Sequence, residues 1–287
     1  MTQPVLKTVN LNDSQIQYLH YTGNGPVIIM LHATGFLPWL WHPIAEKLNH
    51  DHSFEIIAPY FCDHRDIDPE KGGVHWVILA EDLFHMCQKL NIQKVHLIGH
   101  SMGAVVATLA HTIFKLNTEK MILIEPIFLP DTVYETSITV EDHPLAGKSI
   151  RRRNNWEDQQ SAREYLCSKA LFKNWDEEML SLYIEYGMIS SPDAGGLELT
   201  CSPRKEASLF MGGMHRNPWP LLEKMACPTL IIEGGKSENK QLIDLKKATE
   251  MIPNGFYQEV ADAGHLIPME FPVICLEIFE KFLLLNR

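Results

Sequence analysis

One serine and one histidine have the residue types and surroundings that nucleophilic hydrolysis requires. Ser101 stands in Gly99-His-Ser-Met-Gly103, directly after Val95–Ile98, which is rich in strand-forming residues, and before the small apolar run 104–110. A strand that turns sharply into a helix at a serine is typical of a nucleophile elbow, because the turn presents the hydroxyl clear of the backbone. A serine hydroxyl is a poor nucleophile alone, so this prediction requires a base beside Ser101.

The base is predicted from its place in the chain, because 14 histidines make any one of them uninformative. His265 lies in Asp262-Ala-Gly-His265, just after the predicted strand 256–260. Open α/β sheets place their active sites at the carboxyl ends of the strands. We therefore predict that His265 takes the hydroxyl proton from Ser101, and that a carboxylate holds His265 in the correct tautomer.

The remaining pattern predicts the fold that positions these groups. Strand-like segments alternate with helical ones outside residues 127–220, which favours a mostly parallel sheet with right-handed crossovers. The strands are expected at 6–11, 15–21, 27–31, 54–58, 95–98, 120–126, 227–235 and 256–260. Helices are expected at 41–48, 76–90, 104–110 and 271–285. Within 127–220 the pattern changes to helical segments between irregular loops, at 156–169, 175–188 and 204–211, which predicts an inserted helical cap. Residues 1–126 and 221–287 would then form the core.

The motifs 99–103, 31–36 and 262–265 resemble those of the α/β-hydrolase fold superfamily, in the branch with a helical lid inserted after the sixth strand. The resemblance implies an eight-stranded, mostly parallel sheet flanked by helices, and the chain order serine, acid, histidine. It also implies an oxyanion hole formed by the backbone N–H groups of Thr34 and Met102. Ala33 stands where glycine is usual in that family, so the loop is expected to differ slightly.

Two glutamates compete for the role of the acid. The resemblance places the acid in the loop after the seventh strand, here residues 234–239, and Glu238 is our first choice. Glu125 is the alternative, since some members of the superfamily, notably certain haloalkane dehalogenases, have the acid after the sixth strand. Asp262 is too close to His265 along the chain to reach the far side of its ring comfortably.

Other charged and metal-binding residue types are given weaker interpretations. Cys62, Asp63 and His64 are potential metal ligands, but adjacent residues rarely converge on one ion, and we predict no metal site. His32 is expected to tie its loop by hydrogen bonds. The run 151–153, three arginines, is predicted to be a solvated charged face, with recognition of an acidic substrate as the alternative.

Composition restricts the partners and the location. The formal charge of −11 argues against binding to nucleic acid or to an anionic membrane surface. No run of about 18 apolar residues and no apolar signal core near Met1 is present, so we expect a cytoplasmic protein. The six cysteines lack C-x-x-C spacing and suit a reducing compartment. The expected partner is a small-molecule substrate, and no feature favours one oligomeric state.

These observations predict a serine hydrolase without a cofactor, which cleaves a small carboxylic ester or related acyl substrate through an acyl-enzyme intermediate. Ser101 argues against haloalkane dehalogenase and epoxide hydrolase chemistry, because enzymes of those types use an aspartate at this position. Two alternatives remain. One is hydrolysis of a C–C bond in a β-diketone by a similar triad, and the other is a ligand-binding receptor with vestigial hydrolysis.

Overall fold

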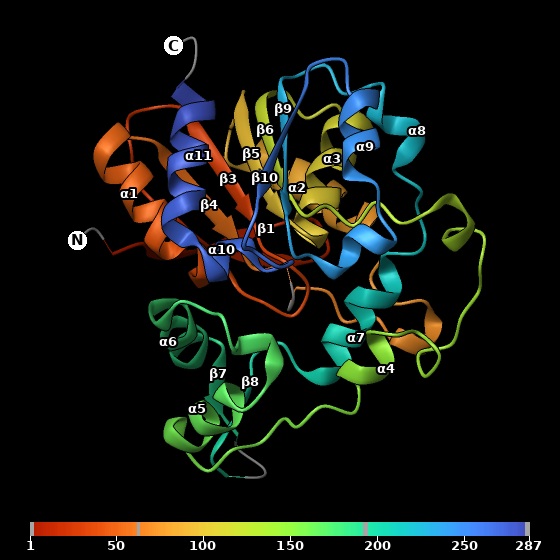
Figure 1. Cartoon of the computed structure of the whole chain (residues 1–287). Coiled ribbons are helices and arrows are strands. Elements are labelled where there is room, and N and C mark those ends of the chain that lie inside the picture. The colour runs from red at the N-terminus through yellow and green to blue at the C-terminus, as the bar shows by residue number, and fades with distance from the viewer. Residues whose placement is uncertain (1–2, 62–63, 192–194, 285–287) are drawn as a thin grey trace.

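The computed structural model describes residues 3–61, 64–191 and 195–284. Its centre is an eight-stranded sheet (Figure 1). Only the pairs β1·β2 and β2·β4 are antiparallel, so the predicted mostly parallel sheet is confirmed. In spatial order the strands are β1 (Val5–Asn10), β2 (Gln15–Tyr21), β4 (Glu55–Pro59), β3 (Val27–Leu31), β5 (Val95–His100), β6 (Thr118–Ile124), β9 (Thr229–Gly234) and β10 (Gly255–Val260).

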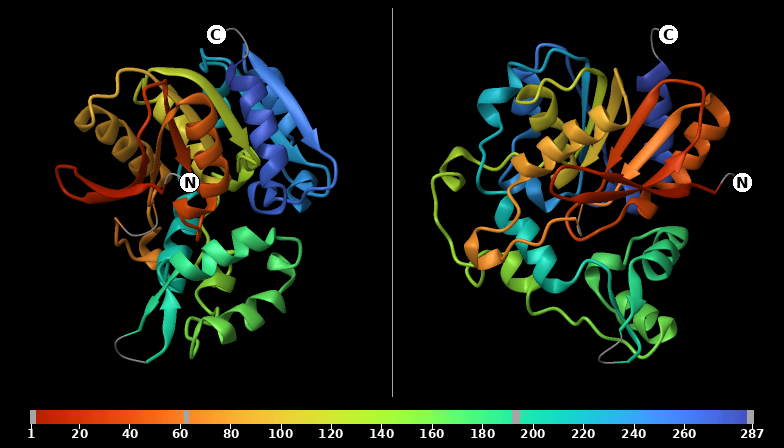
Figure 2. Two further views of the ribbon diagram at one scale, coloured as in Figure 1. Left: turned by 90° about the vertical axis from the view of Figure 1, so that its left-hand side faces the viewer. Right: turned by 180° about the vertical axis from the view of Figure 1, so that it is seen from behind.

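Helices cover both faces of this sheet (Figure 2). Helices α1 (His42–His52) and α11 (Pro272–Leu284) pack on one face, while α2 (Trp76–Lys89), α3 (Met102–Thr112) and α9 (Leu245–Met251) pack on the other. The short 3-10 helices η1 (Pro38–Trp41) and η2 (Pro69–Lys71) follow β3 and β4 in the chain.

Strand β3 shows why a central strand has a continuously apolar sequence. Ile28 and Met30 belong to the apolar cluster that contains α1 and α11. Ile29 and Leu31 belong to the cluster on the opposite face, with α2 and α3. Successive side chains point to opposite faces of a strand, so a strand covered on both faces needs an apolar residue at every position.

Most of residues 127–220 lie beyond the carboxyl ends of the strands, in the lower part of Figure 1, whereas α8 (Trp219–Leu222) at the end of this range lies beside α9 at the upper right. The three helices expected there are present, two with shorter bounds than predicted and the third, at 203–212, slightly longer. Residues 188–190 and 197–199 form a two-stranded ribbon that periodicity did not predict, because three residues are too short for a pattern. The elements are η3 (Asp131–Val133), α4 (Ala146–Ser149), α5 (Gln159–Cys167), η4 (Ala170–Phe172), α6 (Glu177–Tyr186), β7 (Met188–Ser190), β8 (Leu197–Leu199), α7 (Pro203–Gly212) and α8 (Trp219–Leu222).

An aromatic cluster joins the segment 127–220 to the loop that follows β3. Phe36 of that loop lies with its ring centroid 5.5 Å from Trp175 and 5.9 Å from Tyr183. Met269 of α10 (Ile267–Glu270) accepts a backbone hydrogen bond of 2.8 Å from Asp176. The segment therefore packs against the two core loops that follow β3 and β10.

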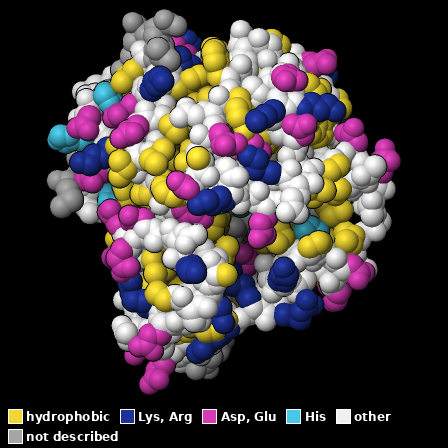
Figure 3. Space-filling model, viewed as in Figure 1, with side chains coloured by type: hydrophobic (Ala, Val, Ile, Leu, Met, Phe, Trp, Pro, Cys, Tyr) yellow, Lys and Arg dark blue, Asp and Glu magenta, His cyan; other side chains and the backbone are white. Residues whose placement is uncertain are grey.

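One face of the molecule carries its charges in a mixed pattern. On the face shown in Figure 3, Lys and Arg side chains are interspersed with Asp and Glu.

None of the helices in the described ranges has the length and apolar character needed to cross a membrane.

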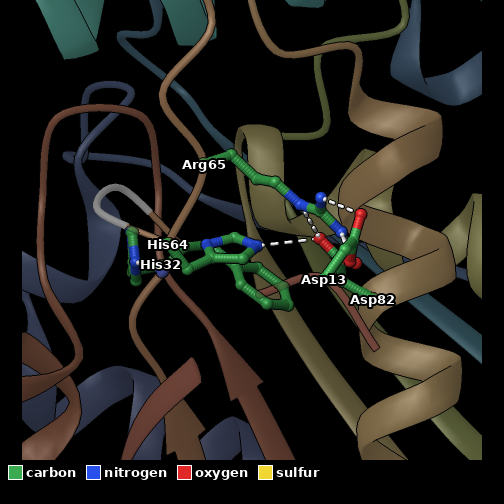
Figure 4. Close-up of polar contacts among 6 residues, drawn as sticks. Asp13, His32, His64, Arg65 and Asp82 are labelled. Atoms are coloured by element: carbon green, nitrogen blue, oxygen red, sulfur yellow. Dashed lines mark hydrogen bonds and ion pairs between the residues drawn. The ribbon is translucent and has the colours of Figure 1, made fainter. Parts of the chain in front are cut away.

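An ion-pair network anchors the loop that follows β4 (Figure 4). Arg65 forms paired hydrogen bonds with Asp82 of α2, at 3.0 and 2.6 Å, and with Asp13 of the β1–β2 turn, at 2.7 and 3.0 Å. His64 contacts Asp82 at 2.9 Å. Of the three residues considered above as potential metal ligands, Cys62 and Asp63 lie outside the described residues.

Asp82→Asn is expected to reduce the free energy of unfolding by roughly 3–5 kcal/mol at pH 7, because it removes the buried carboxylate that binds Arg65. Burial alone would raise the pKa of Asp82, but hydrogen bonds from His64 and Arg65 overcome burial and lower it. This stabilisation is fully present above the unfolded-state pKa of about 4 and is lost as pH falls through the lower folded-state pKa. Denaturant titrations of wild type and variant should therefore converge as the pH is lowered from about 4.

Asp13→Asn is the matched control for this prediction. Asp13 binds the same guanidinium, but its side chain is 67% exposed, and exposed ion pairs are screened by water. Its loss should therefore change the denaturation midpoint much less than the loss of Asp82. Equal effects of the two substitutions would contradict the assignment of the stabilisation to the buried pair.

Candidate active site

Ser101 occupies the sharp turn between β5 and α3. Its backbone has φ 57° and ψ −114°, a conformation that a non-glycine residue rarely adopts. A Cβ atom on Gly103 would collide with the backbone of Leu31, and one on Gly99 would collide with Gly103. The N–H of Ser101 donates to the carbonyl of Ile124 at 2.9 Å, which ties the turn to β6. The two glycines are therefore required by close backbone packing at the turn.

His265 reaches the serine from the loop after β10. Its Nε2 atom lies 3.1 Å from Ser101 Oγ, within hydrogen-bond distance. Ser101 is 7% exposed, whereas 29% of the His265 side chain is accessible. The structure thus brings together the two residues that the sequence predicted as nucleophile and base.

Glu125 contacts the other ring nitrogen of His265, with Oε2 3.0 Å from Nδ1. Glu125 follows β6, has φ 48° and is almost completely buried. Its Oε1 accepts the N–H of Gly234 at 2.7 Å, and its Oε2 accepts the hydroxyl of Ser237 at 2.7 Å. These donors satisfy a buried carboxylate and fix it against the ring.

Glu238, our first choice for the acid, does not occupy that position. Residues Glu238–Gln241 form the 3-10 helix η5, in which neighbouring side chains point in directions about 120° apart. Glu238 faces solvent as a result, while Asn239 turns inwards. We therefore correct the preferred position of the acid from Glu238 to Glu125, the alternative.

Asn239 makes a contact that sequence analysis did not anticipate. Its Nδ2 atom lies 2.9 Å from Nδ1 of His265 and 3.4 Å from Oε2 of Glu125. It belongs to the loop 234–239 that was predicted to supply the acid. The loop therefore contacts the histidine through an amide, from the residue after Glu238, and not through a carboxylate.

The loop after β3 holds Thr34 in a tight turn beside this triad-like arrangement. Phe36 N–H donates to Ala33 O at 3.2 Å, and Gly35 between them has φ 77°. His32 donates from Nδ1 to Ala33 O at 2.8 Å and accepts the N–H of Phe61 at Nε2, at 2.9 Å. His32 therefore fixes the peptide that joins Ala33 to Thr34.

His100 links the serine turn to the loop of His265. Its Nε2–H donates to the backbone carbonyl of His265 at 2.9 Å. Burial, together with the neighbouring His265, lowers the pKa of His100 to about 3, so it stays neutral at physiological pH. In the sequence, the only sign that His100 belongs to the site is its position next to Ser101, because the carbonyl it binds lies 165 residues away.

The arginines of the run 151–153 have separate environments. Arg152 forms an ion pair of 2.7 Å with Glu206, which packs against Gly35 of the Thr34 loop. Arg153 lies over the ring of Tyr165, with its guanidinium carbon 5.1 Å from the centroid. Arg151 is exposed. Two of the three therefore make specific contacts instead of forming one solvated face.

No group of three or more potential metal ligands occurs in the part of the chain that the structure describes. The arrangement has instead the groups for acyl transfer, namely a hydroxyl, a base hydrogen-bonded to it and a carboxylate behind the base.

Comparison with known proteins agrees with this architecture. The sequence profile described as "Alpha/beta hydrolase family" matches residues 28–277. The chain belongs to the α/β-hydrolase family. A Haemophilus influenzae protein named "Putative esterase/lipase" is 25% identical over 284 residues, which cover 96% of this chain and 88% of that protein. Together with the family match, these similarities show that the chain is a hydrolase.

Solved α/β-hydrolase structures share the fold at low sequence identity. E-2-(acetamidomethylene)succinate hydrolase superposes with a TM-score of 0.81 at 19% identity, covering 98% of this chain and 99% of that one. An esterase from Thermogutta terrifontis, solved with malate bound, gives a TM-score of 0.69 at 23% identity and covers 98% of each chain.

Proposed function

We propose that this α/β-hydrolase is a serine hydrolase that cleaves a small carboxylic ester or related acyl substrate through an acyl-enzyme. The observation that carries the proposal is a pair of consecutive hydrogen-bond contacts. Ser101 Oγ lies 3.1 Å from His265 Nε2, and His265 Nδ1 lies 3.0 Å from Glu125 Oε2. Glu125 keeps the proton on Nδ1, so Nε2 is free to accept the proton of the hydroxyl.

The reaction follows from these roles in two halves. Ser101 Oγ attacks the acyl carbonyl while His265 takes its proton, and the imidazolium then protonates the departing alcohol. Water next gives a proton to the same Nε2 and attacks the acyl-enzyme, which releases the acid and restores Ser101. Glu125 stabilises the imidazolium in both halves.

The backbone N–H groups of Thr34 and Met102 are proposed to bind the oxyanion. Met102 is the first residue of α3, so its N–H has no acceptor within the helix and the positive end of the helix dipole lies beside it. The Thr34 peptide is fixed by the hydrogen bond from His32 to Ala33 O. Preorganised donors of this kind typically contribute about 10²–10³-fold in kcat each.

Thr34→Val tests whether the backbone or the side chain of Thr34 acts. The Thr34 hydroxyl is buried without a hydrogen-bond partner among the described residues, so its replacement by a methyl group should raise the free energy of unfolding by about 1 kcal/mol. Because the backbone N–H remains, kcat should stay within about threefold of wild type. A loss of more than about tenfold would assign the donor role to the hydroxyl.

The inserted segment 127–220 is proposed to be a cap that sets substrate specificity. Its Trp175 packs on Phe36 of the Thr34 loop, and its Glu206, paired with Arg152, packs on Gly35 of the same loop. The segment contains none of Ser101, His265 and Glu125. The names of the similar proteins, a putative esterase/lipase and an esterase, favour ester substrates for this chain.

A panel of p-nitrophenyl esters of increasing acyl length tests the proposed function. Sustained turnover of hundreds of cycles, highest for short acyl chains, is expected. A single burst followed by no further release would instead indicate a receptor with vestigial hydrolysis. Turnover of a β-diketone without turnover of any ester would indicate C–C bond hydrolysis.

A further inference from the structure

The buried carboxylate of Glu206 lies directly against the Thr34 loop. A Cβ atom added to Gly35, the residue after Thr34, would overlap Oε1 of Glu206, so the glycine leaves the space that this carboxylate occupies. Glu206 belongs to α7 in the segment 127–220, whereas the Thr34 loop belongs to the core. A side chain of this segment therefore contacts the loop that is proposed to supply one donor of the oxyanion hole.

Helix α7 is itself fixed to the core, which defines the position of Glu206. The N–H of Val74 donates to the carbonyl of Ser208 at 3.1 Å. The indole N–H of Trp76, in α2, donates to the carbonyl of Leu209 at 2.8 Å. Ser208 and Leu209 lie within one helical turn of Glu206. The contact with Gly35 therefore depends on a helix that is anchored to α2 and to the loop before it.

Arg152 neutralises Glu206 and reaches the same loop by a second route. Its Nη1 atom donates to Oε2 of Glu206 at 2.7 Å, and its Nη2 atom lies 3.4 Å from the hydroxyl of Tyr183. The ring of Tyr183 packs on Phe36, the residue after Gly35, at a centroid distance of 5.9 Å. Burial alone would lower the pKa of Arg152, whereas Tyr183 and Glu206 raise it, so the guanidinium stays charged.

The charge of this pair matters because a negative charge develops beside it. In the proposed reaction the oxyanion forms at the backbone N–H of Thr34. An uncompensated carboxylate against the next residue would repel that charge, and burial weakens the screening by water. With Arg152 in place the pair has no net charge, so Glu206 supports the loop without opposing the oxyanion.

We propose that Glu206 and Arg152 are positioning residues for the oxyanion hole: Glu206 holds the Thr34 loop through Gly35, and Arg152 cancels the charge of Glu206. The inference rests on the proposed serine hydrolysis. It adds that the segment 127–220 contributes to kcat as well as to substrate specificity. Neither residue has to touch the substrate in this role.

Arg152→Gln tests the role of the charge, because it leaves Glu206 buried beside the loop without its cation. We expect kcat for p-nitrophenyl esters, expressed per site that a fluorophosphonate labels, to fall about 30–100-fold with KM within about threefold of wild type. Adding Glu206→Gln removes the uncompensated charge and keeps the volume of the side chain. This double variant should recover at least about tenfold of the lost kcat. A pair that acted only through stability would show no such recovery.

Glu206→Ala tests the packing role, because it empties the space beside Gly35. We expect kcat to fall about tenfold with KM unchanged. Arg163→Gln is the matched control, since it breaks the ion pair with Glu177 that also joins two helices of the segment. Glu177 is exposed, so its kcat should lie within about twofold of wild type.

A folded Arg152→Gln protein with unchanged kcat would overturn the role of the charge, as would a double variant no more active than Arg152→Gln. An unchanged kcat in Glu206→Ala would overturn the packing role. If Arg152→Gln did not fold, Glu206→Ala and the double variant would decide. The inference predicts a lower kcat for Glu206→Ala, because only the double variant still fills the space beside Gly35, and equal values would overturn it.

The proposed function fails by a different result. If wild type turned over no ester, or if Ser101→Ala were as active as wild type, serine hydrolysis itself would be rejected. If wild-type turnover depended on Ser101 and the Glu206 and Arg152 variants kept the wild-type kcat, only the inference about this pair would be rejected.

Discussion

Ser101→Ala is expected to lower kcat for ester hydrolysis by at least about 10⁵-fold, since removal of the nucleophile from a triad has an effect of this size. The free energy of unfolding should change by less than about 1 kcal/mol, the typical value of one hydrogen bond. Alanine retains the Cβ atom and hence the same positive φ of 57°, and the substitution removes the hydrogen bond between the hydroxyl and His265. Steady-state kinetics and thermal unfolding of the same preparations provide the comparison.

A folded Ser101→Ala protein that kept more than about 1% of wild-type kcat would contradict the nucleophile assignment. A variant with a strongly lowered thermal midpoint would instead show that the hydroxyl stabilises the turn. The assignment would then be judged on Ser101→Cys, which keeps a nucleophile in the same place.

Glu125→Gln is expected to lower kcat by about 10⁴-fold with little change in KM, which corresponds to about 5 kcal/mol of activation free energy. The substitution preserves size but removes the charge that stabilises the imidazolium and selects its tautomer. Because that interaction is made mainly in the transition state, kcat and kcat/KM should fall equally. The measurement is a full Michaelis–Menten analysis with the best p-nitrophenyl ester.

Glu238→Gln is the matched control, since it makes the same chemical change in an exposed side chain of the neighbouring loop. We expect its kcat to lie within about threefold of wild type. If Glu238→Gln lost most of the activity and Glu125→Gln kept it, the acid would act from the loop after β9 despite the contacts of Glu125. If neither cost more than about tenfold, Ser101 and His265 would work without a dedicated carboxylate.

The parts of the fold that could be predicted are those with a local sequence signal. The run Val95–Ile98 and the glycines at 99 and 103 identify a strand, a turn and a helix from adjacent residues. Asp262–His265 was found because it follows the last strand of the sheet, where strand ends converge. In each case the physical requirement, either close backbone packing or sheet topology, is visible in the order of residues.

The acid could not be selected in the same way, because the choice depends on side-chain direction. The 3-10 turn of Glu238–Gln241 turns Glu238 towards solvent, whereas Glu125, with a positive φ, places its Oε2 atom 3.0 Å from Nδ1 of His265. Neither feature has a signature in single-residue propensities. The donors that hold Glu125 lie 109 and 112 residues further along the chain, at Gly234 and Ser237.

Long-range interactions also explain which partners around the site were not predicted. The bond from His100 to the carbonyl of His265 spans 165 positions, and the ion pair Arg152–Glu206 spans 54. An arginine run resembles a surface feature in sequence, because nothing local specifies that its middle member will meet a buried carboxylate. Such partners become visible only when the inserted segment is packed against the core.

Labelling with a fluorophosphonate tests the central claim, that Ser101 forms a covalent bond during catalysis. The reagent phosphonylates a serine only when a neighbouring base activates the hydroxyl. Trypsin cleavage after Lys94 and Lys115 yields a peptide in which Ser101 is the only serine, so mass spectrometry can locate the adduct. We predict one equivalent of adduct on peptide 95–115 of wild type and none on Ser101→Ala. An adduct on another peptide, or equal labelling of the Ser101→Ala protein, would contradict this claim.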